Sequence, residues 1–271
     1  NEDLAREYEP DWNSKKIYRK TGIQTRHITT TETTSQLAAQ AAEKLFSESG
    51  FAKEKIDFLL LCTQSPDYFL PTTACIVQDM LCLPTTCGAF DFNLGCSGFV
   101  YGLAIAKGLI AGGMAKNVLL LTVETYSKYI HPKDKSVRTI FGDGAAATLI
   151  THEGSDTYKI GEFVFGTDGK GAKNLIVPAG AMAMPKTEET SKETIDEQGN
   201  VRSLNNLYMN GPEIFNFTLD TVPDTVKSLL EKEKLAMDDI DLFVFHQANK
   251  FMLDSLRDKI GIPEEKFYVN M

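Results

Sequence analysis

The feature that most constrains how this chain can fold is a pattern of helices and buried strands that occurs twice. Residues 34–49 carry apolar side chains at helical spacing and stop at Gly50, and residues 56–61 form an apolar run broken by one aspartate. Residues 218–232 and 240–245 repeat this helix and strand later in the chain. Helices that alternate with buried strands predict right-handed parallel crossovers, and therefore a layered α/β fold.

The two copies align at nearly constant offsets. An offset of 184 residues pairs Leu45 with Leu229, Ile56 with Ile240, Asp57 with Asp241, and Cys62 with His246. An offset of 179 residues pairs Leu81 with Ile260, Pro84 with Pro263, and Phe90 with Val269. Any two α/β units share the rhythm of helix and strand, but the coincident Ile-Asp and proline positions favour a duplication. We therefore predict two halves, residues 1–155 and residues 156–271.

Both ends of this pattern look incomplete. The chain opens on Asn1, a residue typical of a helix N-cap, and acidic residues of a first helical turn follow it. It stops within a strand predicted at residues 265–271. In the first half a glycine-rich turn follows the second strand, so we expect its counterpart beyond Met271.

Charge and composition exclude several classes of protein. The 28 basic and 37 acidic residues give a formal net charge of −9, which argues against broad nucleic-acid binding. The longest apolar stretch, residues 92–106, is shorter than the ~20 residues that span a bilayer. The five cysteines lack zinc-ligand spacing, so we expect no metal and a reducing, cytoplasmic location.

One cysteine stands in a context that favours chemistry. Cys96 lies between a short buried strand at residues 89–92 and an apolar helix at residues 97–112, with small residues on either side of it. Backbone N–H groups at a helix start would stabilise a thiolate and a developing oxyanion, so we predict a lowered pKa for Cys96. The other four cysteines are predicted to be small buried core residues, with Cys75 and Cys82 on one helix.

One histidine could work with Cys96. His246 ends the strand of the second copy, and side chains at the carboxyl ends of parallel strands face the usual ligand crevice. A buried, hydrogen-bonded core histidine is the alternative. Because the duplication places the end of this strand near its counterpart in the first half, we predict that His246 pairs with Cys96.

A basic segment precedes the first repeat. Between Trp12 and Arg26 the chain carries five basic residues and no acid: Lys15, Lys16, Arg19, Lys20 and Arg26. This segment is either a solvated helix face or a seat for a phosphorylated or acidic partner. A polar stretch at residues 185–200 is predicted to be a mobile loop.

Four motifs together resemble a known family. They are Thr-Gly-Ile with Arg-His-Ile at residues 21–28, Asp-Phe-Asn-Leu-Gly-Cys-Ser-Gly-Phe at 91–99, Phe-Gly-Asp-Gly-Ala at 141–145 and His-Gln-Ala-Asn at 246–249. In this order and spacing they are similar to beta-ketoacyl-(acyl-carrier-protein) synthase III, of the thiolase-like superfamily. The resemblance implies a duplicated five-layer αβαβα fold, usually in a homodimer, and here incomplete at the N- and C-terminus.

The resemblance also implies a reaction, the decarboxylating Claisen condensation that initiates fatty-acid biosynthesis. Cys96 matches the nucleophile that takes an acyl group from acyl-CoA, and His246 matches the histidine that stabilises the enolate formed from malonyl-(acyl carrier protein). No cofactor is implied. The partners implied are acyl-CoA and acyl carrier protein, with neither nucleic acid nor membrane.

The sequence departs from the family at several positions. The third catalytic residue, an asparagine, is expected beyond Met271, so a chain ending there should acylate Cys96 but condense poorly. Lys16 and Lys135 stand where the well-studied synthases stack the CoA adenine between tryptophan and arginine, and lysine cannot stack in that way. Leu70 stands where phenylalanine often bounds the acyl pocket. We place these residues at the substrate together with Lys20 and Asn249.

Other functions stay open at this point. A 3-hydroxy-3-methylglutaryl-CoA synthase or a polyketide-type synthase is the nearest alternative. A Cys–His thioesterase would release a free acid, and a non-catalytic acyl-carrier-protein binder would result if the third residue were truly absent. A thiolase is disfavoured, because no second cysteine follows Cys96.

Overall fold

The computed structural model describes residues 1–8, 10, 12–152 and 159–271, and it contains two compact units. The sheet unit comprises residues 27–126 and 143–161, and the helix unit comprises residues 1–26, 127–142 and 162–271. The units thus interleave along the chain. The division into halves at residue 155 concerns the sequence repeat, and it stays a prediction.

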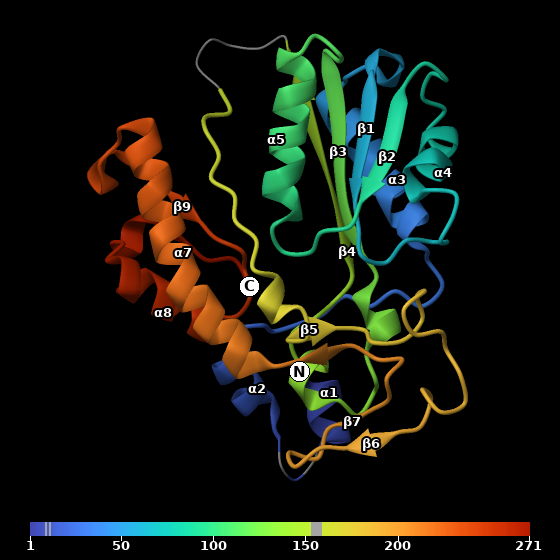
Figure 1. The fold of residues 1–271 in the computed structure, drawn as a ribbon, viewed down its shortest axis with the longest axis vertical. Helices are drawn as coiled ribbons and strands as arrows, with labels where there is room; N and C mark the ends of the chain where they lie inside the picture. The colour runs from blue at the N-terminus through green and yellow to red at the C-terminus, as the bar shows by residue number, and fades with distance from the viewer. Residues whose placement is uncertain (9, 11, 153–158) are drawn as a thin grey trace. The chain divides into compact units, whose positions relative to one another are not determined.

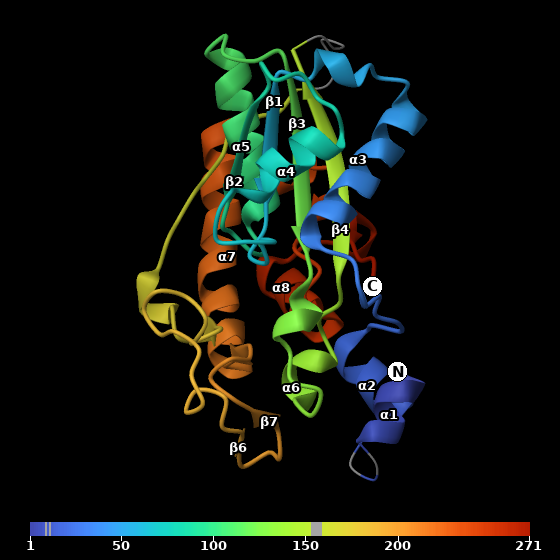
Figure 2. The same ribbon diagram turned by 90° about the vertical axis from the view of Figure 1, so that its right-hand side faces the viewer.

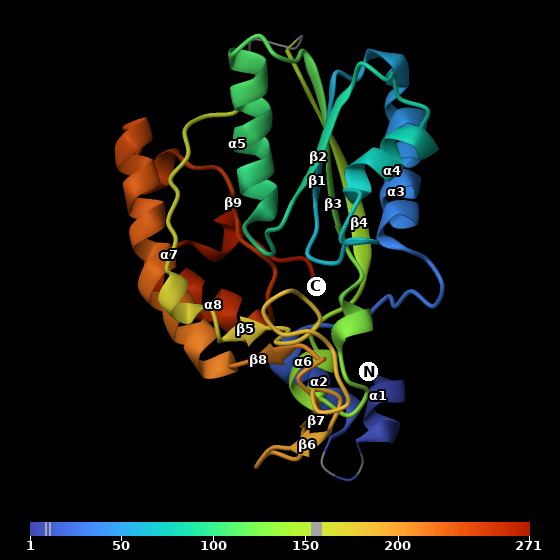
Figure 3. The ribbon, with the colours of Figure 1, turned by 45° about the vertical axis from the view of Figure 1, so that its right-hand side comes forward.

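The sheet unit is a four-stranded sheet with helices on both faces (Figure 1). Its elements are α3 (Thr34–Ser49), η1 (Lys53–Lys55), β1 (Phe58–Cys62), α4 (Thr73–Met80), β2 (Gly88–Phe92), α5 (Gly98–Ala111), β3 (Asn117–Glu124) and β4 (Gly144–Thr151). The strand order is β2-β1-β3-β4, with β1 parallel to both β2 and β3, and β4 antiparallel to β3. Helices α3 and α4 lie on one face and α5 lies on the other (Figure 2, Figure 3).

Strand β1 is buried on both faces, which explains its continuous apolar run. Leu59 and Leu61 pack in the core beneath α3 and α4, whereas Leu60 packs in the core beneath α5. The strand begins at Phe58, two residues later than predicted, and just before it the Asp57 carboxylate accepts the backbone N–H groups of Lys116 and Asn117 at 2.8 and 2.9 Å.

The connections of this sheet place its carboxyl edge at a switch point. Helix α4 links β1 to β2 on one face, and α5 links β2 to β3 on the other face, crossing β1. In open α/β sheets ligands bind outside the carboxyl ends of the strands at such a point. The turn that carries Cys96 lies there, between the end of β2 and the start of α5.

The helix unit is built around a shorter parallel pair of strands. Its elements include α1 (Glu2–Glu7), α2 (Ser14–Thr21), α6 (Lys135–Arg138), β5 (Leu175–Ile176), β6 (Thr194–Ile195), β7 (Val201–Arg202), β8 (Tyr208–Met209), α7 (Gly211–Glu233), η4 (Met237–Asp239), β9 (Phe243–Val244), α8 (Lys250–Ile260) and β10 (Phe267–Tyr268). Strands β9 and β10 are parallel, and the pairs β5–β8 and β6–β7 are antiparallel. The core of this unit gathers Phe243, Leu253, Ile262 and Phe267.

The order of elements predicted from the repeat is confirmed. Helix, strand, helix and strand follow one another as α3, β1, α4 and β2, and again as α7, β9, α8 and β10. Helix α3 has the predicted bounds, but α7 begins at Gly211, seven residues earlier than predicted, because Asn210 caps its first turn. Strand β9 is shorter than predicted, and among the described residues it pairs only with β10.

The two copies also share backbone turns that the sequence comparison did not reveal. Gly50 follows α3 at φ 66°, and Lys234, 184 residues later, follows α7 at φ 59°. Cys82 at φ 52° and Gly261 at φ 81° correspond in the same way, at the offset of 179. Each helix therefore turns into the next segment through a left-handed residue, even where that residue is not glycine.

Two of the four cysteines predicted to be buried are exposed. Cys62 is buried and Cys87 is partly buried, but Cys75 and Cys82 face solvent. Cys75 lies on α4, and Cys82 lies beyond the end of that helix. The prediction was wrong because α4 buries only one narrow stripe, at Thr73, Ala74 and Val77. Among the described residues no helix is both long and apolar enough to cross a bilayer.

Candidate active site

Cys96 sits in a tight turn that ends directly at α5. The N–H of Gly98 donates to the carbonyl oxygen of Gly95 at 2.8 Å and so closes the turn around the cysteine. Cys96 itself is exposed, and the fourteen-residue α5 begins two residues later. The predicted position of Cys96 in a turn directly before a helix is therefore confirmed, and its role as a nucleophile stays a prediction.

Both glycines near Cys96 have close neighbours. A Cβ atom on Gly98 would lie 2.2 Å from Cys62 Sγ, and one on Gly95 would lie 2.6 Å from Gln64 Oε1. The Cys62 thiol also donates to the carbonyl oxygen of Leu94 at 3.1 Å. Burial raises the pKa of Cys62 to about 11, so this thiol acts as a neutral packing group beneath the turn.

We expect Gly98→Ala to destabilise the protein by about 1–3 kcal/mol, because the new methyl overlaps Cys62 Sγ. Cys62→Ala removes that sulfur and leaves Cys62 Cβ at 3.7 Å, an ordinary contact. The double variant should therefore lose less stability than the sum of the two single variants. Urea unfolding of all four proteins measures this coupling.

Gly108→Ala on the same helix is the matched control, since beyond its chain neighbours and the helix's own backbone nothing lies within 4 Å of its added Cβ. It should leave stability unchanged or raise it slightly. Strictly additive effects of Gly98→Ala and Cys62→Ala would show that the contact with the sulfur does not govern the turn.

The predicted direction of the Cys96 pKa was wrong. Desolvation by the surrounding protein raises the pKa of the thiol, its own backbone N–H lowers it, and the negative charge of Glu124 raises it further. Desolvation and the charge of Glu124 thus outweigh the lowering by the backbone N–H. At neutral pH the resting state of Cys96 is the thiol, which must lose its proton to act as a nucleophile.

Glu124 is a site residue that the sequence analysis missed. It ends β3, where its carboxylate accepts the N–H of Gln64 at 2.8 Å and the hydroxyl of Ser65 at 2.8 Å. Desolvation, with a smaller contribution from the charge of Asp143, raises the pKa of Glu124 to about 7 against these two hydrogen bonds. An acidic residue that ends an otherwise apolar strand was the signal available in the sequence.

His246 follows β9 in the helix unit. Its carbonyl oxygen accepts the N–H of Ala248 at 3.0 Å, which turns the chain toward α8. The residue as a whole reaches solvent, but the protein around the ring desolvates it and lowers the pKa of the imidazole, so the ring is neutral at pH 7. Because His246 and Cys96 belong to different units, their pairing stays a prediction.

The residues predicted to contact substrate lie in varied surroundings. On α2, Lys16 Nζ and Lys20 Nζ stand 5.2 and 4.9 Å from the centre of the Trp12 ring. Lys135 is partly buried at the start of α6. Asn249 caps α8 by accepting the N–H of Met252 at 2.9 Å.

Leu70 is 83% exposed, as are Phe69 to 74% and Tyr68 to 63%. Within this chain Leu70 therefore does not bound a closed cavity. These three consecutive residues form an exposed apolar segment, which we call the 68–70 segment.

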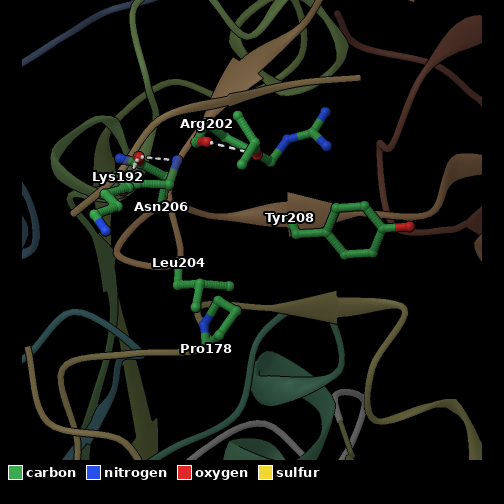
Figure 4. A pocket seen from close by; sticks show the side chains of 8 residues that line it. Pro178, Lys192, Arg202, Leu204, Asn206 and Tyr208 are labelled. Carbon is green, nitrogen blue, oxygen red and sulfur yellow. Dashed lines mark hydrogen bonds between the residues drawn. The ribbon is translucent and has the colours of Figure 1, made fainter. Parts of the chain in front are cut away.

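A cavity of about 280 Å³ in the helix unit involves none of these residues (Figure 4). Arg202 and Tyr208 line it, and Arg202 is neutralised by Asp134 and Asp196 at 2.8 and 2.6 Å. With two carboxylates on one guanidinium, this cluster anchors the β6–β7 hairpin instead of offering a charge to an anion. Part of residues 185–200, predicted as a loop, thus forms strand β6.

Two family models match the chain. The model for 3-oxoacyl-[acyl-carrier-protein] synthase III matches residues 90–169, which include Cys96, and the model for the C-terminal part of these synthases matches residues 230–271, which include His246. In the described part of the chain, no three His, Cys, Asp or Glu side chains gather as metal ligands do.

Relatives with the same family name are similar to this chain over most of their length. The beta-ketoacyl-[acyl-carrier-protein] synthase III of Lactococcus lactis subsp. cremoris is 37% identical over 271 residues, which are all of this chain and 79% of the relative. A crystal structure of a 3-oxoacyl-(acyl-carrier-protein) synthase III is 54% identical, with a TM-score of 0.97 over all of this chain and 80% of that one. The 3-oxoacyl-(acyl-carrier-protein) synthase of Burkholderia xenovorans is 38% identical, with a TM-score of 0.84 over 98% of this chain and 74% of its own.

Proposed function

The chain belongs to the 3-oxoacyl-[acyl-carrier-protein] synthase III family, and from this premise we propose that Cys96 and His246 carry out its condensing reaction. Members of this family are condensing acyltransferases with a thiolase-like fold, so the predicted fold class and enzyme class are confirmed. The observation that supports the assignment of the nucleophile is the exposed Cys96 thiol at the start of α5.

The first step is transfer of an acyl group to Cys96. The thiol loses its proton, its sulfur attacks the carbonyl carbon of the acyl thioester, and the carrier leaves as a thiolate that takes up a proton. Negative charge builds on the carbonyl oxygen, which the backbone N–H groups at the start of α5 would stabilise. Because desolvation raises the pKa of Cys96, we expect this step to need a proton acceptor.

The second step joins the acyl group to the malonyl donor. The bond between the malonyl carboxyl carbon and its neighbour breaks, carbon dioxide leaves, and the resulting enolate carbon attacks the Cys96 thioester and displaces the sulfur. The neutral ring of His246 would donate a hydrogen bond to the enolate oxygen. The lowered pKa of His246 favours this neutral ring over the charged imidazolium. An asparagine beyond Met271 would be the third member of this site.

The lysines of α2 support binding of a phosphate-bearing carrier. Lys16 and Lys20 present two cations beside the Trp12 ring, an arrangement that suits the phosphates of CoA more than stacking of its adenine. We place Lys135 and Asn249 at the same substrate. Delivery of the primer by acyl carrier protein is the alternative.

The exposed 68–70 segment supports a homodimer. An apolar run this exposed is typical of an interaction site, and β2 is an edge strand of its sheet. We propose that a second copy covers this surface and that Leu70 bounds the acyl pocket of that copy. The five free cysteines are consistent with a reducing, cytoplasmic location, and the proposed chemistry uses no cofactor.

An acylation assay on the full-length protein tests this function directly. Incubation with an acyl-CoA, and separately with the same acyl group on acyl carrier protein, should add the mass of the acyl group to the peptide that contains Cys96. Addition of malonyl-(acyl carrier protein) should then yield a 3-oxoacyl product and carbon dioxide. Release of free acid without condensation would indicate a thioesterase instead, and no acylation by either carrier would contradict the proposal.

A further inference from the structure

A chain of contacts links the end of β3 to the turn that holds Cys96. Glu124 accepts the backbone N–H of Gln64 and the Ser65 hydroxyl, both at 2.8 Å. The Ser65 oxygen in turn accepts the N–H of Thr125 at 2.9 Å. One carboxylate thus fixes the segment that follows β1 against the end of β3.

The Gln64 side chain carries this constraint to the nucleophile. Its amide oxygen accepts the hydroxyl of Tyr126 and lies against Gly95, where an added Cβ would come within 2.6 Å. Gly95 is the residue immediately before Cys96, and its carbonyl oxygen closes the turn. Glu124 is therefore connected to the Cys96 turn through a single residue, Gln64.

The charge of Glu124 adds to this geometric link. The groups that act on Glu124 are Gln64 and Ser65 after β1, which stabilise its ionised form, and Asp143 before β4, which opposes it. Desolvation contributes most to the raised pKa of the Cys96 thiol, and the negative charge of the Glu124 carboxylate raises it further. With a pKa of about 7, Glu124 changes its charge in the range where a condensing enzyme would work.

We propose that Glu124 is a positioning residue for Cys96. Glu124 holds the turn at Gly95 through Gln64, and the reactivity of the Cys96 thiol depends on whether the Glu124 carboxylate is ionised. Its role in acyl transfer rests on the proposed function, whereas its effect on the thiol does not. Glu124 acts through Gln64 and through its charge, without touching substrate.

The test is the pH dependence of Cys96 alkylation by iodoacetamide, read by mass spectrometry after chymotrypsin cleavage. Cleavage after Phe92 and Phe99 separates Cys96 from the exposed Cys75 and Cys82. In the unmodified protein the alkylation rate should rise with pH as the thiolate forms. Because ionisation of Glu124 near pH 7 disfavours the thiolate, the curve should show a shoulder near pH 7. Glu124→Gln keeps a hydrogen-bond acceptor but has no charge. We expect it to lose the shoulder and to alkylate roughly two- to fivefold faster at pH 8.

Glu43→Gln is the matched control, since Glu43 pairs with Lys53 on the outer side of α3. It should leave the profile unchanged. Tyr126→Phe tests positioning without a change of charge, because it removes only the hydroxyl that Gln64 accepts. It should lower the rate of acylation by acyl-CoA roughly three- to tenfold while leaving the shoulder in place.

Each outcome decides part of the proposal. An unchanged profile in Glu124→Gln overturns the coupling by charge, and full acylation by Tyr126→Phe overturns the positioning through Gln64. A shoulder that disappears in a protein unable to accept any acyl group would support the coupling and contradict the proposed function, so the two failures are distinguishable.

Discussion

Replacement of Cys96 with serine is expected to lower acyl transfer by at least about 10³-fold and to leave the fold unchanged. Serine has nearly the same size as cysteine but holds its proton far more tightly, so it is a much weaker nucleophile at neutral pH. Cys96 is an exposed residue and the exchange of sulfur for oxygen is nearly isosteric, so little packing is lost. Intact-mass measurement of acyl incorporation, together with thermal unfolding, separates the loss of chemistry from a loss of structure.

Cys75→Ser is the control for this experiment. Cys75 is also an exposed thiol, but it lies on α4 away from the start of α5. The control should accept the acyl group at the normal rate. Acyl transfer that persists in Cys96→Ser, with the label on another residue, would show that the nucleophile was assigned wrongly.

Replacement of His246 with alanine should separate the two halves of the reaction. We expect condensation to fall roughly 10²- to 10³-fold because the enolate loses a hydrogen-bond donor. Acylation of Cys96 should fall less. Product formation from malonyl-(acyl carrier protein) and acyl incorporation, measured on the same preparation, give the two rates. His152→Ala, which changes an exposed histidine after β4, is the control.

The pH dependence follows from the direction of the His246 shift. Its lowered pKa means that the ring stays neutral below the ordinary value of about 6.5, so condensation should persist to more acidic pH than an unshifted histidine would allow. Condensation should then decline as the ring becomes protonated. Equal losses of acylation and condensation in His246→Ala would argue against a role confined to the enolate.

The sequence predicted best what depends on local pattern. Helix α3 was found with its bounds because apolar spacing and Gly50 define it, and the Cys96 turn was found because small residues flank the cysteine. These features depend on residues that are neighbours in the chain. The same holds for the order of elements in the two copies.

The predictions that failed concern properties that depend on residues distant in the sequence. The pKa of Cys96 is raised by crowding and by Glu124, which is twenty-eight positions away, so a rule based only on the helix start gave the wrong direction. Glu124 was missed for the same reason, since only the parallel pairing of β1 with β3 brings it to Gln64. Cys82 was wrongly assigned to the helix. It is itself the left-handed residue that follows α4, and a glycine at this position would have marked the end of the helix in the sequence.

The left-handed residues that close the paired helices have a consequence for engineering. At each of the two equivalent positions one copy has glycine and the other has Lys234 or Cys82, and a side chain in that backbone conformation costs about 1 kcal/mol. Both copies thus keep the left-handed backbone at the end of the helix, although only one of them has the glycine that suits it best. Each copy therefore serves as a template for improving the other, because it shows which residue releases the strain that its counterpart retains.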